Sequence, residues 1–183
     1  MNKTLVVVDM INGFINTGMM HDTRINNITP TIINLINSIN KDNTYFIADS
    51  HNEDAIEFKT FPKHCIKGTL ESKVINELQE YILPNHLIEK NSTNTFFNFI
   101  KLNILDNNDI YIVGCCSDIC VLQFALTLLA YINEYNLPNK VYVITDAIDT
   151  FNNDNHNADE YNNIAIKIMS TNGINLITSK DII

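Results

Sequence analysis

The sequence of 183 residues is poor in the residues that build disulfide scaffolds, flexible linkers or nucleic-acid surfaces. Four cysteines, five glycines and four prolines argue against a disulfide framework and against a Gly- or Pro-rich linker. Lysine and arginine together number 12, against 21 acidic residues. The resulting net charge of -9 repels polyanions, so we expect neither nucleic acid nor an anionic membrane as a partner.

Long apolar runs are also missing. No run approaches the roughly 20 apolar residues that span a bilayer. Met1-Asn2-Lys3 leads directly into Thr4–Val8, which is too short for the core of a signal peptide and lacks a cleavage site of small residues. We therefore expect a cytoplasmic protein.

What the sequence does contain is typical of one globular domain. Hydrophobic residues make up 45% and charged residues 18% of the chain, and its length suits one substantial core. We find no internal repeat and predict a single domain over residues 1–183.

Six short runs of apolar and β-branched residues predict β-strands. Several of these runs do not alternate with polar residues, which favours strands buried on both faces of a parallel sheet. The predicted strands are Thr4–Val8, Thr44–Ala48, His86–Glu89, Asp109–Val113, Lys140–Ile144 and Asn175–Thr178.

Helical patterns separate these runs. Thr29-Pro30 is typical of an N-cap followed by proline in the first turn, and Phe96–Ile100 supplies a second apolar face. Ser117-Asp118 is predicted to cap a long helix. The pattern over Ala158–Thr171 ends near Gly173, a typical C-terminal stop. Strands that alternate with helices predict a three-layer α/β/α domain around a mostly parallel sheet of six strands.

Residues with reactive side chains follow four of the predicted strands. Asp9, Asp49, Lys90 and the pair Cys115-Cys116 each come at or just after a strand end. Because the carboxyl ends of parallel strands meet at one edge of the sheet, where ligands bind in such folds, we expect these residues to share that edge.

Cys120 lies just inside the start of the predicted long helix. Free N–H groups and the positive end of the helix dipole favour a thiolate there, although a small buried core residue is the alternative. Lys90 alone is compatible with a surface charge, and Asp9 alone with a turn. Together the three supply a nucleophile, a carboxylate that moves its proton and a cation that stabilises it, as a cysteine amidase needs.

A second group of residues has the chemistry of metal ligands. In Asp49-Ser50-His51, an extended backbone directs the first and third side chains to the same face, and Glu57 and His64 follow. One carboxylate and two imidazoles suit zinc, manganese or iron. The alternative is a polar loop with incidental histidines.

The remaining candidates are aromatic or lie in a polar segment. Phe14, Phe61 and Phe97 are predicted to line a substrate pocket, with packing in the core as the alternative for the first two. His156 and Asp159 fall in an Asn-rich segment, and we interpret both as solvated loop residues.

These motifs resemble those of the isochorismatase-like cysteine hydrolases, and of the nicotinamidases among them. The resemblance extends from Val6 to about Ile177. The segments that carry it are Val7–Phe14, Asp49–His51, Phe61–Thr69, Glu89-Lys90 and Gly114–Val121. The chain departs from the family at Ser117, where threonine is commoner.

The resemblance implies a six-stranded parallel sheet with Asp9, Lys90 and Cys120 as catalytic residues. It also implies a cis peptide between Cys115 and Cys116, with the backbone N–H groups of Cys116 and Cys120 forming an oxyanion hole. The family's metal site often has a fourth ligand between the two histidines. Glu57 holds that place here, and the neighbouring acidic residues at positions 53 and 54 are rivals.

The resemblance implies that the protein hydrolyses a small aromatic amide, nicotinamide in particular. It also implies that the protein binds one divalent metal ion, with zinc expected before manganese or iron. The nucleophilic Cys120 argues against the vinyl-ether hydrolysis after which the superfamily is named. Two alternatives stay open: a cysteine hydrolase of a carbamoyl amine or ureido acid, whose relatives generally lack the metal residues, and a non-catalytic ligand-binding protein. We also expect a homo-oligomer, of a size that the sequence leaves open.

Overall fold

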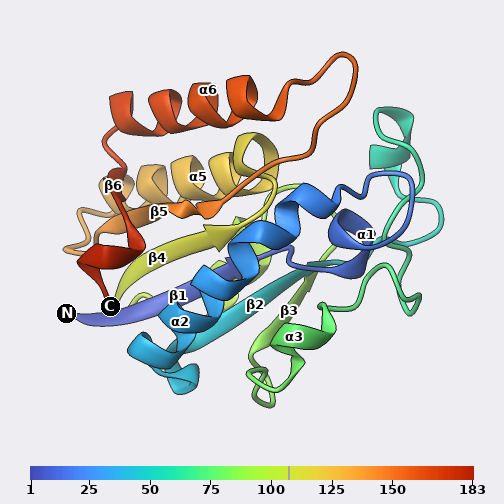
Figure 1. Ribbon diagram of the computed structural model, residues 1–183. Helices are drawn as coiled ribbons and strands as arrows, with labels where there is room; N and C mark the ends of the chain where they lie inside the picture. The colour runs from blue at the N-terminus through green and yellow to red at the C-terminus, as the bar shows by residue number, and fades with distance from the viewer. Residues whose placement is uncertain (107) are drawn as a thin grey trace.

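The computed structural model describes residues 1–106 and 108–183 and contains a six-stranded sheet of order β3-β2-β1-β4-β5-β6 (Figure 1). Every pairing is parallel, so the sheet is parallel throughout rather than mostly. All six predicted strands are confirmed to within a few residues at each end. They are β1 Asn2–Val8, β2 Thr44–Asp49, β3 Leu87–Lys90, β4 Asn108–Gly114, β5 Val141–Ile148 and β6 Asn175–Ile177.

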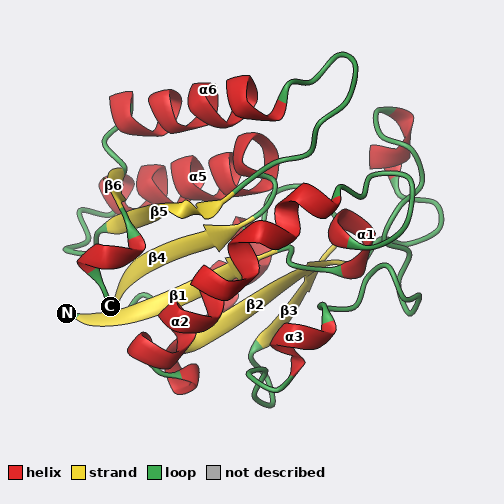
Figure 2. Ribbon diagram, in the orientation of Figure 1, coloured by secondary structure: helices red, strands yellow, loops and turns green. Residues whose placement is uncertain are grey.

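Helices cover both faces of this sheet, which confirms the three-layer architecture (Figure 2). Helix α2 packs on one face, and α4, α5 and α6 contribute to the core on the other. The helices are α1 Asn12–Ile15, α2 Thr29–Ile39, α3 Asn76–Gln79, α4 Phe96–Phe99, α5 Leu122–Glu134 and α6 Ala158–Thr171. None of them, within the described ranges, is long and apolar enough to cross a membrane.

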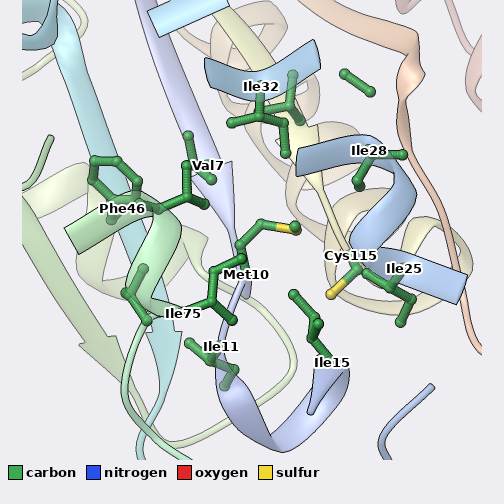
Figure 3. Packing of buried hydrophobic residues seen from close by; sticks show 14 of the residues in the cluster. Val7, Met10, Ile11, Ile15, Ile25, Ile28, Ile32, Phe46, Ile75 and Cys115 are labelled. Carbon is green, nitrogen blue, oxygen red and sulfur yellow. The ribbon is translucent and has the colours of Figure 1, made fainter. Parts of the chain in front are cut away.

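Strand β1 shows why the apolar runs do not alternate. Leu5 and Val7 belong to the core on the α2 face, whereas Val6 and Val8 belong to the core on the α5 face. Successive side chains of a strand point to opposite faces, so the part of a central strand that is covered on both sides, here Leu5–Val8, is apolar without alternation. Figure 3 shows the first of these cores, where Val7 lies among residues from several elements.

Two predicted N-caps are wrong. A 3-10 helix over Thr23–Ile28 runs directly into α2, so Thr29 is already helical and its hydroxyl donates to Asn26 Oδ1 instead of capping. Ser117 likewise lies inside a π-helical turn, Ser117–Val121, that leads into α5. An N-cap needs an extended backbone, which neither residue has there. The end of α6 is as predicted, because Gly173 follows it with a φ of 94°.

Gly114 sets the path from β4 into the cysteine pair. Its φ is 108°, and a Cβ atom there would lie 2.0 Å from the carbonyl oxygen of Val8 in β1. The next residue, Cys115, donates its backbone N–H to that same oxygen over 2.9 Å. Only glycine allows this close approach, which places Cys115-Cys116 directly beside the end of β1.

Candidate active site and metal site

The residues predicted to share one edge of the sheet do meet there. Asp9 follows β1, Asp49 and Lys90 end β2 and β3, and the pair Cys115-Cys116 follows β4. Asp49 and Lys90 are direct partners in the register between β2 and β3. The prediction of a common site at the carboxyl ends of the strands is confirmed.

Lys90 is the centre of this site and is not a surface charge. It is buried, and its ammonium forms a short hydrogen bond to Asp49 Oδ1. The same Nζ lies 2.9 Å from Asp9 Oδ2 and 3.8 Å from Cys120 Sγ. Asp9 is held in place by its other oxygen, Oδ1, which accepts the backbone N–H of Asp49 over 3.0 Å. One cation therefore touches both carboxylates and the thiol.

Burial and close charges act against each other on these side chains. Burial raises the pKa of Asp9 to about 6, although Lys90 beside it acts in the opposite direction. Burial also disfavours a charged Asp49, but Lys90 and the histidines His51 and His64 outweigh it and hold the pKa of Asp49 below its ordinary value. For Lys90, the two carboxylates outweigh burial and raise its pKa. Asp9 is thus the carboxylate of the pair that can exchange a proton near neutral pH.

Cys120 is buried, which acts against the thiolate that its place near a helix start favours. Burial raises the pKa of its thiol well above the ordinary value, and Lys90 opposes this only in part. The start of the helix therefore does not by itself make a thiolate, because the side chain is taken out of water. Burial thus favours the neutral thiol, and a carboxylate oxygen of Asp9 lies within 4.8 Å of Sγ. Asp9 Oδ2, which pairs with Lys90 over 2.9 Å, has a further lone pair with which it can accept the thiol proton.

The peptide between Cys115 and Cys116 is cis, as the resemblance implies. The Cys115 thiol donates to the backbone oxygen of Asp9 over 3.1 Å, and burial raises its pKa. Cys65 is also buried with a raised pKa, and its Sγ packs against Gly13, where a Cβ atom would come within 2.4 Å. Cys65 and Cys115 therefore pack in the core. Of the four cysteines, Cys116 and Cys120 line the pocket described below.

The predicted metal ligands converge beside Lys90. Asp49 Oδ2 lies 3.5 Å from His51 Nε2 and 3.8 Å from His64 Nε2. One ligand atom from each of these three buried residues lies within 4.8 Å of the others. Glu57 Oε1 is 3.9 Å from His51 Nε2, whereas the acidic side chains at positions 53 and 54 are exposed. The geometry thus favours Glu57 over its two rivals.

Several buried polar atoms of this cluster have no hydrogen-bond partner among the described residues, and they are of the kinds that bind a divalent metal ion. His64 Nδ1 is 2.8 Å from the carbonyl oxygen of Pro62, which can only accept a hydrogen bond, so Nδ1 donates to it and, in the neutral ring, Nε2 is the nitrogen that would bind a metal ion. Both ring nitrogens of His51 and Oε1 of Glu57 are buried without a hydrogen-bond partner among the described residues. Leaving such atoms unpaired is costly, and a cation would satisfy them.

A narrow pocket joins the two groups of residues. Its wall includes Phe14 and Phe61, as predicted, but not Phe97. The prediction for Phe97 is wrong because α4 buries Phe99 and leaves Phe97 61% exposed. Three further residues of the wall were not predicted: Met20, Thr93 and Ile119. Ile119 lies within the motif around Cys120, but nothing in the sequence singles out Met20.

Comparisons with known proteins agree with this architecture. A family model described as "Isochorismatase domain" matches residues 3–181. An isochorismatase family protein, PncA of Bacillus subtilis, is 29% identical over 177 residues, which cover 85% of this chain and 91% of the relative. Nicotinamidase 1 of Arabidopsis thaliana is 29% identical over 152 residues, covering 71% of this chain and 61% of the relative.

A solved structure shares the fold. The pyrazinamidase of Pyrococcus horikoshii in complex with zinc superposes with a TM-score of 0.78 at 22% identity, and the match covers 97% of this chain and 99% of that one. The family model spans almost the whole sequence, including every residue of the site described above. The chain therefore belongs to the isochorismatase family of hydrolases.

Proposed function

We propose that the protein is a metal-containing cysteine amidohydrolase that converts nicotinamide and water into nicotinate and ammonia. The observation that carries this proposal is the contact of one buried ammonium, Lys90, with both Asp9 and the Cys120 thiol at the wall of a small pocket. The names of two relatives, a nicotinamidase and a pyrazinamidase, support an amide on an aromatic ring. We place the reaction in the cytoplasm, where thiols stay reduced.

The first half of the proposed reaction forms a thioester. Asp9 Oδ2 accepts the Cys120 proton as Sγ attacks the amide carbon, and the carbonyl oxygen gains the negative charge. Backbone N–H groups of Cys116 and Cys120 stabilise this oxygen. The carbon–nitrogen bond then breaks, and Asp9 gives its proton to the nitrogen, which leaves as ammonia.

The second half uses the same groups in reverse. Asp9 takes a proton from water, whose oxygen attacks the thioester carbon. The carbon–sulfur bond breaks, and the proton returns from Asp9 to Cys120, leaving the resting enzyme and nicotinic acid, which releases its remaining proton to the solvent as nicotinate. A carboxyl group with a pKa of about 6 suits both directions of transfer near neutral pH. Lys90 stays charged throughout and stabilises the thiolate as it forms.

The metal would be held by Asp49, His51, His64 and Glu57, with zinc expected first and manganese or iron as alternatives. When bound, it supplies a Lewis-acid contact for the ring nitrogen of the substrate. The chain's own aromatic residues, Phe14 and Phe61, provide apolar walls for the ring. A flat heteroaromatic amide matches this combination of apolar walls and one polar end.

The test is ammonia release from nicotinamide, pyrazinamide and an N-carbamoyl amino acid. We compare the wild type with Cys120→Ala and with Cys65→Ala, which removes a buried thiol outside the pocket. We expect nicotinamide hydrolysis by the wild type and by Cys65→Ala and none by Cys120→Ala. Ammonia from the carbamoyl compound alone would favour the ureido hydrolase, and ammonia from none of the three would favour a ligand-binding protein. Equal activity in Cys120→Ala would refute the nucleophile.

A further inference from the structure

The turn that carries Cys120 is held by the loop between β5 and α6. Asp118 lies in this turn, two residues before Cys120, and its side chain is largely buried. Its Oδ1 accepts a hydrogen bond from Thr150 Oγ1 over 2.6 Å, and its Oδ2 lies 2.8 Å from His156 Nε2. A carboxylate only accepts hydrogen bonds, so His156 donates from Nε2. Each oxygen of Asp118 therefore has its own donor from one loop.

His156 is fixed in orientation from three sides. Its second ring nitrogen, Nδ1, is 2.9 Å from the carbonyl oxygen of Phe151. Its ring stacks between Phe151, with centroids 4.1 Å apart, and Tyr161, with centroids 3.8 Å apart. Only 12% of the His156 side chain is exposed. The interpretation of His156 as a solvated loop residue is therefore wrong, because Phe151, Tyr161 and Asp118 surround its ring.

The start of this loop is anchored independently of His156. Asp149 forms a two-point ion pair with Arg24, with Nε–Oδ2 at 2.9 Å and a second contact of 3.0 Å from Nη2 to Oδ1. The backbone oxygen of Asp149 accepts the N–H of Ser117 over 3.0 Å. Arg24 also pairs with the exposed Asp159 at the start of α6 over 2.7 Å. The Arg24 ion pairs thus fix the loop in position, and the contact between His156 and Asp118 connects the loop to the centre of the Cys120 turn.

We propose that Asp118 and His156 form a positioning pair that holds the Cys120 turn in its reactive arrangement. The inference rests on the proposed function, since it takes Cys120 as the nucleophile. Neither residue is among those that line the pocket, so neither is expected to bind substrate. The turn carries the thiol and one of the two backbone N–H groups proposed to stabilise the oxyanion, that of Cys120, and the other, that of Cys116, comes directly before it. A displacement of about 1 Å there can cost about 100-fold in rate.

Two conservative variants separate this role from simple packing. In His156→Gln, the side-chain amide can still donate from the position of Nε2 to Asp118. In His156→Asn, the shorter amide reaches only the position of Nδ1 and its contact with Phe151. Both variants lose the aromatic stacking, so their difference shows whether the turn depends on the contact with Asp118 or on the contact with Phe151. Asp159→Asn is the control, because it weakens an exposed ion pair beside the loop and leaves Asp118 untouched.

The readouts are kcat and KM for nicotinamide and the rate at which iodoacetamide labels Cys120, measured by peptide mass spectrometry on folded protein. We expect His156→Asn to lower kcat and the labelling rate by about 10- to 100-fold with KM within about twofold. His156→Gln should recover most of both rates, and Asp159→Asn should match the wild type. Equal losses in the Gln and Asn variants, or rates within twofold of wild type in His156→Asn, would overturn the proposal. If the wild type does not hydrolyse nicotinamide, the proposed substrate fails, and the labelling ratio alone decides this inference.

Discussion

Replacing Lys90 by methionine removes a charge and preserves much of the side chain's length and apolar character. In the wild type, Nζ lies 3.8 Å from Cys120 Sγ. With an effective dielectric constant of about 20, a unit charge at that distance stabilises a thiolate by about 4 kcal/mol. That energy corresponds to about three powers of ten in rate. Rearrangement of the emptied site would recover part of it, so we expect Lys90→Met to lower kcat/KM by about 100- to 1000-fold.

The same substitution also changes the proton balance of the site. Asp9 and Asp49 would remain as two buried carboxylates without the cation between them. Lys90 lowers the pKa of Asp9, so its removal raises that pKa further above about 6. At neutral pH, Asp9 is then protonated for more of the time and cannot accept the thiol proton. We expect the acid limb of the kcat/KM profile to lie near pH 6 in the wild type and at higher pH in Lys90→Met.

The assay is kcat/KM for nicotinamide from pH 5 to 9 (roughly the span around the ordinary histidine and cysteine pKa values), with the rate of Cys120 alkylation over the same range. Lys67→Met is the matched control, because Lys67 is exposed and pairs with Glu89 over 2.7 Å at the surface. The control should stay within about 0.5 kcal/mol of wild-type stability and keep the wild-type profile. A Lys90→Met enzyme with a rate within threefold of wild type (about 0.7 kcal/mol) and an unshifted acid limb would remove Lys90 from the mechanism.

Three further predictions follow from the buried site and its support. Cys120→Ala should leave the fold intact and abolish both turnover and the iodoacetamide label; a label that persists on Cys120-free protein contradicts the assignment. Wild-type protein should carry about one divalent ion per chain, and His51→Ala should lose most of it, as measured by elemental analysis; unchanged occupancy would refute the ligand set. Gly114→Ala should lower the free energy of unfolding by at least about 2 kcal/mol in urea titrations, because its Cβ would lie 2.0 Å from the Val8 oxygen; an unchanged midpoint would contradict the steric argument.

The sequence by itself determined the sheet and the edge where chemistry gathers. Mainly apolar runs such as Thr4–Val8 identify central strands, because both faces of such a strand are covered by the core. Parallel strands place their carboxyl ends together, so Asp9, Asp49 and Lys90 could be assigned to one site from their positions alone. These conclusions depend on local patterns and on a general rule of topology, and they hold in the structure.

The surroundings of each side chain, by contrast, were decided by the tertiary structure. The position of Cys120 near a helix start favours a thiolate and leaves a buried core residue as the alternative, and the structure buries the side chain, which raises the pKa of its thiol although Lys90 opposes this. The choice of Glu57 among neighbouring acidic residues depends on which side chain the 51–64 loop directs toward His51. Phe97 turns outward because α4 presents Phe99 to the core.

The support of the Cys120 turn is the clearest case. Asp118 and His156 are 38 residues apart, and no periodicity in the sequence connects them. Their contact exists because the loop after β5 folds back over the turn after β4, held there by Arg24 from a third segment. Solvation, hydrogen-bond partners and charge contacts depend on which atoms are neighbours in space, and that is set only when separate segments pack together.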